Sequence, residues 1–173
     1  MIVVVGGAGY IGSVVVEALV DRGYDVAVVD DLSIGHRQAV PDSVEFYEAD
    51  MADPDVIENI GNKYDPDAVM HFAALALVGE SVEEPDRYWN QNVRKSIEMF
   101  DRWIETGVRD FIFSSTAATY GEPRYLPIDE DHPQDPINPY GRSKLMSEWM
   151  LQDTCNASPM RSVILRYFNV AGC

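Results

Sequence analysis

Basic residues are scarce in this sequence, and their scarcity excludes a class of partners. The 173 residues contain 13 lysines and arginines against 29 acidic residues, so the formal net charge is −16. Because such a surface repels phosphate backbones and anionic bilayers, we expect no nucleic acid and no membrane as partner. The acid-rich composition is compatible with a protein of a high-salt cytoplasm and, equally, with an ordinary acidic protein.

Cysteine, histidine and long apolar runs are also scarce. The two cysteines, Cys155 and Cys173, form no CxxC pair, and the three histidines are scattered along the chain. Structural disulfides and a metal site are therefore not expected. No apolar run approaches the length of a membrane span, and the chain starts in a strand without a basic leader. We expect a soluble, cytoplasmic protein, and the length predicts one domain over residues 1–173.

The N-terminal segment carries the most informative pattern. The apolar run Ile2–Val5 predicts a buried strand, and glycines at positions 6, 9 and 12 follow it before an apolar stretch that predicts a helix. This spacing is a variant of the dinucleotide fingerprint, in which glycines allow a tight turn and bring the backbone close to a pyrophosphate at the helix N-terminus. The cofactor-binding residues expected here are Gly6, Gly9, Tyr10, Ile11 and Gly12.

The second predicted strand, residues 24–29, ends in Asp30 and Asp31. Asp30 follows Gly12 at close to the roughly 20-residue offset at which an acid binds the adenosine ribose hydroxyls. An acid there also repels a 2′-phosphate, which favours NAD over NADP. His36 and Arg37 lie downstream, so the phosphorylated cofactor is disfavoured and not excluded. Simple turn chemistry is the alternative for both aspartates.

Further apolar segments alternate with helical patterns. Strands are predicted at 44–47, 67–72, 111–113 and 162–167, and helices from Pro54 to near Gly61, from Pro85 to Thr106 and from Pro139 onward. This alternation predicts an α/β fold, a Rossmann-like doubly wound parallel sheet of about six strands with helices on both faces. Its ligand is expected at the carboxyl ends of the strands.

Small and polar residues follow the predicted strands at that edge. Asp50 and Met51 are candidates for adenine contact or are ordinary loop residues, and Ala73 and Ala74 leave room for the cofactor. We interpret His71, inside a strand, as a core histidine with satisfied hydrogen bonds.

The helix after Pro85 has an apolar stripe, and other apolar residues lie off it. The stripe comprises Val93, Ile97, Phe100 and Ile104, whereas Trp89, Met99 and Trp103 lie off it. Surplus apolar surface indicates a partner chain, and a tightly covered core helix is the alternative.

Tyr140 and Lys144 form the candidate catalytic pair. Four residues apart near a helix start, they share one face. An ammonium group, the helix end and an oxidised nicotinamide would each favour the phenolate and lower its pKa. Thr116 follows the fifth strand, and its hydroxyl can share the substrate's proton. A chance pair on an exposed helix is the alternative. The proline-rich stretch 117–137 is expected to cover the site.

Six segments together resemble the extended short-chain dehydrogenase/reductase superfamily, and within it the UDP-glucose 4-epimerase family. They are residues 6–13, 69–74, 78–82, 111–116, 138–145 and 165–172, and they span almost the whole chain. The resemblance implies tightly held NAD and a nucleotide-sugar substrate of the UDP-glucose/UDP-galactose type. Tyr140 would take the proton of the sugar's 4-hydroxyl while hydride passes from C4 to NAD, and the keto sugar would turn over and receive the hydride on its other face.

The resemblance also implies individual site residues. Asp30 and Asp31 would bind the adenosine ribose, and Asp50 and Met51 the adenine. Other matching cofactor positions are Phe72, Ala73, Asn92, Ser114, Tyr140, Lys144 and Tyr167. Thr116 and Asn169 would bind the substrate.

Members of the family also form dimers and have a second, smaller domain. The resemblance implies a homodimer through the helices after Pro85 and Pro139. The C-terminal substrate domain is absent from these 173 residues, so an NAD-binding module with little or no turnover is the alternative function. A dehydratase is disfavoured because Ala117 and Ala118 stand where an acid would be expected.

Overall fold

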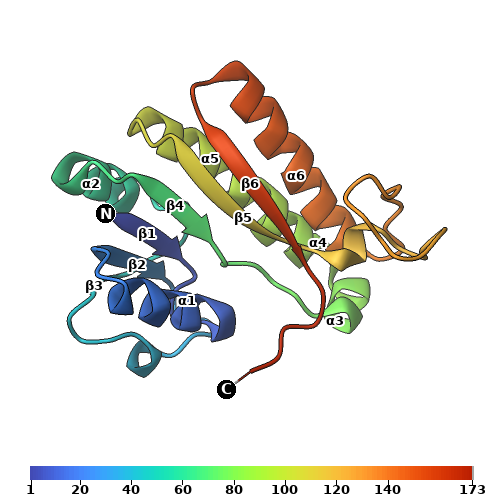
Figure 1. The fold of residues 1–173 in the computed structure, drawn as a ribbon, viewed down its shortest axis with the longest axis horizontal. Coiled ribbons are helices and arrows are strands. Elements are labelled where there is room, and N and C mark those ends of the chain that lie inside the picture. The colour runs from blue at the N-terminus through green and yellow to red at the C-terminus, as the bar shows by residue number, and fades with distance from the viewer. Residues whose placement is uncertain (173) are drawn as a thin grey trace.

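The computed structural model describes residues 1–172, which form one parallel six-stranded sheet with helices on both faces (Figure 1). The strands are β1 (Ile2–Val5), β2 (Val26–Asp30), β3 (Glu45–Glu48), β4 (Ala68–His71), β5 (Asp110–Thr116) and β6 (Arg161–Tyr167). Their order is β3-β2-β1-β4-β5-β6, so the chain progresses outward in both directions from β1. This order confirms the predicted doubly wound fold and places a switch point between β1 and β4.

The fifth strand is longer than the sequence predicts. Ser114, Ser115 and Thr116 continue β5 by pairing with Leu165, Arg166 and Tyr167 of β6. The apolar pattern missed this extension because its residues are polar. The strand therefore carries Thr116 itself to the carboxyl edge of the sheet.

Two of the helices begin at a capping side chain that is followed by proline. The helices are α1 (Tyr10–Asp21), α2 (Pro54–Tyr64), α3 (Val78–Glu83), α4 (Pro85–Tyr88), α5 (Lys95–Glu105) and α6 (Pro139–Ala157), with short 3₁₀ turns at η1 (Arg37–Ala39) and η3 (Ala117–Thr119). The Asp53 carboxylate accepts hydrogen bonds from the backbone N–H groups of Asp55 and Val56, and the Asn138 side chain accepts one from Gly141 N–H at 2.8 Å. Each cap satisfies N–H groups that have no partner within the helix.

Two hydrophobic clusters join the helices to the sheet. In the larger one, α2, α5 and α6 pack on one face of the sheet and bury side chains such as Ile57, Phe100 and Leu151. In the smaller one, Val16 of α1 packs against Val28 on the other face. Figure 1 shows the same arrangement, with α1 on one side of the sheet and α2, α5 and α6 on the other.

The helix predicted from Pro85 to Thr106 is interrupted by a π-helical turn, η2 (Trp89–Arg94). A π turn holds an extra residue and rotates the helix face that follows it. Met99 and Trp103, predicted to lie off the apolar stripe, are consequently fully buried, whereas Ile97 on the predicted stripe is 40% exposed. The surplus apolar surface on α5 is therefore mostly core.

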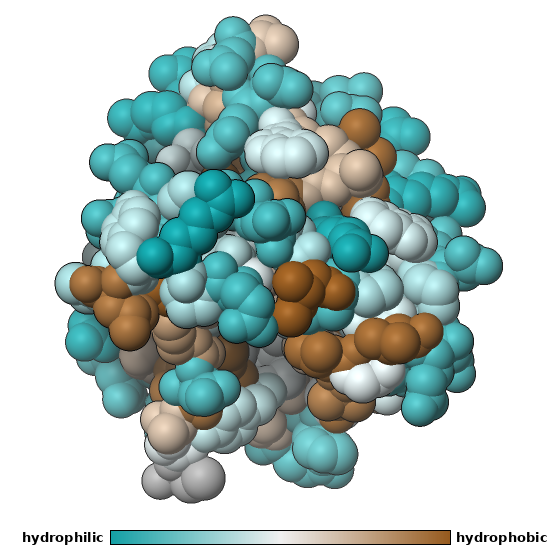
Figure 2. All heavy atoms as spheres, turned by 90° about the vertical axis from the view of Figure 1, so that its right-hand side faces the viewer, coloured by the Kyte–Doolittle hydropathy of each residue, from teal (hydrophilic) through white to brown (hydrophobic). Residues whose placement is uncertain are grey.

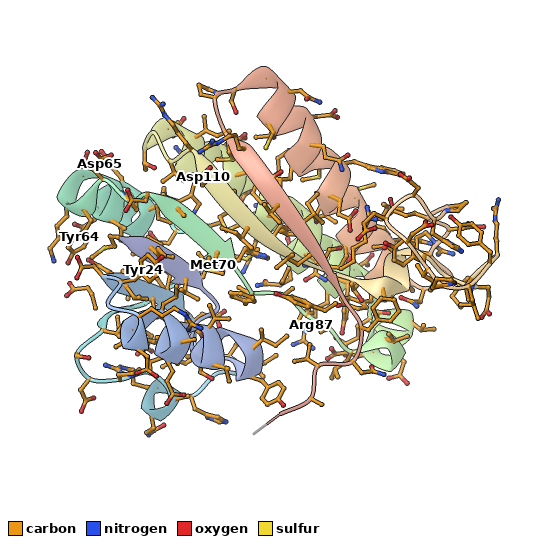
Figure 3. The ribbon with its side chains drawn as sticks, in the orientation of Figure 1. Tyr24, Tyr64, Asp65, Met70, Arg87 and Asp110 are labelled. Carbon is orange, nitrogen blue, oxygen red and sulfur yellow. The ribbon has the colours of Figure 1, made fainter. Side chains whose placement is uncertain are left out.

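Gly61 has a packing role that the sequence did not reveal. The helix does not end there but continues to Tyr64, and Asp65 is its C-cap; Figure 3 labels both residues at the far end of α2. A Cβ atom on Gly61 would lie 2.5 Å from the Thr106 side chain, so the glycine allows α2 to approach the end of α5.

The surface alternates between hydrophilic regions and apolar patches. Figure 2 shows several separate apolar patches on the side that carries α3 and the proline-rich segment. Exposed apolar side chains include Leu77, Val82, Leu126, Ile137 and Phe168. Within residues 1–172, no helix is both long and apolar enough to cross a bilayer.

Candidate functional site

The glycine turn after β1 is packed so tightly that two positions admit no side chain. Gly6 has φ +80°, and a Cβ atom there would lie 2.5 Å from the Ala73 backbone nitrogen. A Cβ atom on Gly12 would lie 2.1 Å from the Gly6 carbonyl oxygen. Gly9 is the N-cap of α1, and among the described residues no side chain caps this helix end. The N-terminus of α1 therefore keeps N–H groups and a positive dipole end for an anionic ligand.

A cavity of about 410 Å³ opens at this turn, beside the switch point between β1 and β4. Its wall contains ten of the predicted cofactor residues: Gly6, Gly9, Tyr10, Ile11, Gly12, Asp30, Asp31, Met51, Phe72 and Ala73. Sequence reasoning missed Ser33, Ile34, Gly35, Leu75, Leu77 and Gln91. Most of these residues follow β2 or β4. Their position just after the carboxyl end of a predicted strand could have identified them as cavity residues.

Asp30 connects the second strand to the glycine turn. Its carboxylate oxygens accept hydrogen bonds from Ala8 N–H and Leu32 N–H, both at 2.9 Å, and the residue is only 8% exposed. Asp31 is exposed and accepts hydrogen bonds from the Ser33 N–H and hydroxyl. Turn chemistry is thus present at both aspartates, and both also border the cavity. A carboxylate oxygen that accepts one hydrogen bond retains capacity for a ligand hydroxyl.

Asp50 and Asn92, both predicted at the cofactor, are not among the residues that line this cavity. Asp50 forms an ion pair with Lys95 and accepts a hydrogen bond from Ala52 N–H at 3.0 Å. Asp50 thus connects the end of β3 to the start of α5.

Asn92 lies in the π turn and is 1% exposed. Its Oδ1 accepts a hydrogen bond from Leu75 N–H, and its Nδ2 donates to the Leu75 carbonyl and to Ser143 Oγ. The backbone carbonyl of Asn92 accepts from Ser96 Oγ and Ser147 Oγ, both at 2.6 Å. Asn92 therefore holds the cavity wall at Leu75 against α6.

The predicted catalytic residues lie at the same carboxyl edge of the sheet as the cavity and are not among the residues that line it. Thr116 ends β5, and Tyr140 and Lys144 lie in the first turns of α6. The Lys144 side chain is 2% exposed, and its Nζ lies 4.1 Å from the centre of the Phe113 ring. Burial lowers the pKa of Lys144 to about 7, and the nearby Glu148 opposes that shift. The pair is therefore not an exposed chance pair on a helix.

Tyr140 is half-buried and contacts a tyrosine that supports the cavity wall. Its ring meets Tyr88 edge-on at 6.3 Å between centroids, and Tyr88 Oη accepts a hydrogen bond from Leu77 N–H at 3.1 Å. Arg87, labelled in Figure 3, pairs with the same Glu80 carboxylate that accepts from Tyr88. Burial raises the pKa of Tyr140, and the Thr116 hydroxyl partly offsets this. The predicted lowering by Lys144 is thus not found in the protein alone.

His71 is buried in β4 behind the same groups, and the interpretation as a satisfied core histidine is wrong. Neither of its ring nitrogens has a hydrogen-bond partner within residues 1–172. The ring stacks on Phe113 at 5.1 Å. Burial lowers the pKa of His71 well below its usual range, and the charge of Lys144 adds to this effect. His71 is therefore a neutral ring beneath Lys144.

The remaining predicted residues are dispersed along β5 and β6. Ser114 pairs with Leu165 and is half-buried, and Tyr167 pairs with Thr116 at the end of β6. Burial raises the pKa of Tyr167. Asn169 is exposed in the segment after β6, which runs past α3 toward α1 (Figure 1). There the Tyr10 hydroxyl donates a hydrogen bond to the Gly172 carbonyl, which brings the segment to the cavity mouth. Cys173 lies outside the described residues.

Comparison with known proteins identifies close sequence relatives. The model of the NAD dependent epimerase/dehydratase family matches residues 2–173. The UDP-glucose 4-epimerase of Azospirillum brasilense is 48% identical over 171 residues, which cover 99% of this chain and 49% of that enzyme. The chain thus spans about half the length of the curated relatives it matches.

Solved structures agree with this assignment. The UDP-glucose 4-epimerase of Brucella ovis in complex with NAD superposes with a TM-score of 0.94 at 48% identity, over 97% of this chain and 51% of that one. The Thermotoga maritima UDP-glucose 4-epimerase with UDP-glucose gives a TM-score of 0.93 at 39% identity, over 99% of this chain and 56% of that one.

Proposed function

The chain belongs to the NAD dependent epimerase/dehydratase family, and from this premise we propose that it binds NAD in the cavity at the glycine turn and supplies the cofactor site and catalytic groups of a nucleotide-sugar 4-epimerase. The observation that carries the proposal is the glycine turn, in which Gly6 and Gly12 allow close backbone packing and the uncapped N-terminus of α1 borders the cavity. That arrangement suits a pyrophosphate.

The residues around the cavity fit the rest of NAD. Asp30 and Asp31 border it with carboxylate oxygens suited to ribose hydroxyls, and their charge disfavours a 2′-phosphate. Met51 provides an apolar wall near the end of β3 for the adenine ring. Phe72 and Ala73 follow β4 and lead toward Lys144, so the nicotinamide half would extend toward α6.

We assign the proton chemistry to Tyr140, Thr116 and Lys144. When bound, NAD would supply reversible hydride transfer at C4 of the sugar. Tyr140 would remove the proton from the 4-hydroxyl and later give it back, while the Thr116 hydroxyl shares that proton. Burial raises the pKa of the free phenol, so positive charge from the oxidised cofactor and from Lys144 has to favour its ionised form.

Lys144 would also hold the nicotinamide ribose, and Tyr167 and Ser114 would lie beside the cofactor ring. Asn169, exposed after β6, would contact the nucleotide sugar. We further propose a homodimer through the helices after Pro85 and Pro139, supported by the exposed Met146 and Trp149 on α6. The second candidate function is NAD binding with little turnover, which the cavity supports because its lining contains neither predicted substrate residue, Thr116 or Asn169.

The test combines cofactor binding with product analysis. Purified protein should bind NAD, measured by calorimetry, and should convert UDP-galactose into UDP-glucose. The Tyr140→Phe variant should bind NAD and lose conversion, because the phenol oxygen is the proposed base. Conversion that survives in Tyr140→Phe would contradict the catalytic assignment. NAD binding without any conversion by the unmodified chain would support the second candidate, and failure to bind NAD would contradict both.

A further inference from the structure

Glu148 is a fully buried carboxylate for which the proposed chemistry has no use. It lies one helical turn after Lys144 on α6 and is 1% exposed. Its Oε1 accepts a hydrogen bond from Ser115 Oγ, and its Oε2 accepts from Gln134 Nε2 at 3.2 Å and from Arg166 at 2.8 Å. Four separate parts of the chain therefore meet at one side chain.

Arg166 extends this cluster into the proline-rich segment. Its guanidinium donates to the Tyr120 hydroxyl at 3.0 Å and to the Glu130 carbonyl at 3.3 Å, in addition to both oxygens of Glu148. The planar guanidinium can form these bonds in several directions at once. The cluster thus fixes the segment after β5 against β6 and α6.

Two of the three partners of Glu148 are next to a residue of the proposed site. Ser115 directly precedes Thr116 on β5, and Arg166 directly precedes Tyr167 on β6. Glu148 itself follows Lys144 by one turn of α6, so the two side chains lie on the same helix face. A shift of the carboxylate would therefore move three proposed site residues relative to one another.

We propose that Glu148 is a positioning residue that holds Thr116, Tyr167 and Lys144 in register and maintains the positive charge of Lys144. This inference rests on the proposed function for the roles of those three residues. A buried ion pair is weak evidence for stability, because desolvation offsets much of the attraction between the charges. Geometry at the site is thus the better reason for burying Glu148 and Arg166 together.

Among the charged and titratable groups of residues 1–172 that surround Lys144, Glu148 is the one that favours the ammonium form. On the helix of Lys144, Tyr140 and Glu148 lie one turn away in each direction. On the sheet, the Phe113 ring faces the ammonium group of Lys144, and the neutral His71 ring stacks on the Phe113 ring. Arg166 is the opposing positive charge, and it is already paired with Glu148. Glu148 is therefore the acidic side chain placed to favour the ammonium form, and it does so against burial.

The test measures the protonation of Lys144 directly in the cofactor-free protein. The side-chain amine of Lys144 is followed by NMR during a pH titration in the unmodified chain, in Glu148→Gln and in the control Asp153→Asn, an exposed acid on the same helix. Glu148→Gln should keep the fold and lower the Lys144 titration midpoint by about one pH unit, because an attractive charge is lost. Asp153→Asn should leave the midpoint unchanged. An unchanged midpoint in folded Glu148→Gln would overturn the proposal.

A second variant covers the case in which Glu148→Gln does not fold. Arg166→Gln removes the positive charge paired with Glu148 and keeps the carboxylate, so the net negative charge near Lys144 increases and the midpoint should rise. No movement in folded Arg166→Gln would then overturn the proposal. NAD affinity of the unmodified chain is measured in parallel. Loss of the proposed function appears there as absent NAD binding, whereas loss of this inference appears only in the Lys144 titration.

Discussion

The side chain of Asn92 pairs with the backbone of Leu75 in both directions. Leu75 N–H donates to Asn92 Oδ1, and Asn92 Nδ2 donates to the Leu75 carbonyl, each at 2.9 Å. The pair is buried, and it joins the π turn before α5 to the loop that forms one wall of the cavity. The amide therefore acts on the cavity through the backbone that lines it.

Asn92→Ala should destabilise the protein and weaken NAD binding together. Removing the amide leaves the buried N–H and carbonyl of Leu75 without their partner, which costs about 2–3 kcal/mol of unfolding free energy. The measurement is urea unfolding combined with calorimetry of NAD binding. The control is Asn90→Ala in the same π turn, where the side chain is exposed and the change should stay within about 0.5 kcal/mol. Equal effects of the two variants would contradict this account.

Gly12→Ala should disrupt the cofactor turn far more than Gly9→Ala. The new methyl group on residue 12 would lie 2.1 Å from the Gly6 carbonyl oxygen, whereas on residue 9 it would lie 3.4 Å from the same atom. We expect the free energy of unfolding to fall by about 1–3 kcal/mol in Gly12→Ala and by less than about 1 kcal/mol in Gly9→Ala. Unfolding by denaturant measures both. NAD affinity should fall at least about tenfold in Gly12→Ala, and a fully stable Gly12→Ala would show that the turn relaxes freely.

His71→Leu should make the protein less sensitive to acid. The folded-state pKa of His71 lies well below its usual range, so the unfolded chain takes up a proton near pH 6.5 that the folded chain does not. Stability of the unmodified protein therefore falls as the pH decreases below that value. His71→Leu removes this contribution and two buried nitrogens without partners. The free energy of unfolding should therefore increase by about 1 kcal/mol at pH 7 and by more at pH 5. Urea unfolding at both pH values measures the difference, with the exposed His36→Leu as control.

Lys144→Met should stabilise the cofactor-free protein while impairing function. The folded-state pKa of Lys144 is about 7, below its usual value of 10.5, so the unfolded chain holds more protons between these pH values. The free energy of unfolding of the unmodified protein therefore rises as the pH increases from about 7 to 10.5. The contribution of Lys144 to stability is least favourable below pH 7. Lys144→Met should be more stable by roughly 2–4 kcal/mol at pH 7, and the difference should shrink toward pH 10. Exposed Lys63→Met is the control, and a destabilised Lys144→Met would contradict the buried-ammonium account.

The sequence predicts those parts of the fold that depend on local chemistry. The glycine turn and the parallel, doubly wound sheet follow from short-range patterns, and the structure confirms them. Gly23 follows the end of α1 with φ +81°, a left-handed conformation that glycine readily adopts after a helix. These features need only neighbouring residues and the rules of parallel sheets.

Features that depend on tertiary contacts were not predictable. The π turn at Trp89–Arg94 rotates α5 and buries Trp103, and a strict 3.6-residue period cannot reveal such an insertion. Asn92 was assigned to the cofactor, yet its partners Leu75 and Ser143 are distant in sequence. The same holds for Glu148, whose buried partners come from three other segments of the chain.

The two hydrogen bonds that Asp30 accepts from Ala8 and Leu32 fix the orientation of its carboxylate before any ligand arrives. Ordering that side chain is consequently part of folding the N-terminal half, and binding a ribose need not immobilise it again. The carboxylate proposed to bind the ribose hydroxyls is thus preorganised. A nucleotide that binds in the cavity would lose conformational freedom, whereas the Asp30 side chain is already ordered.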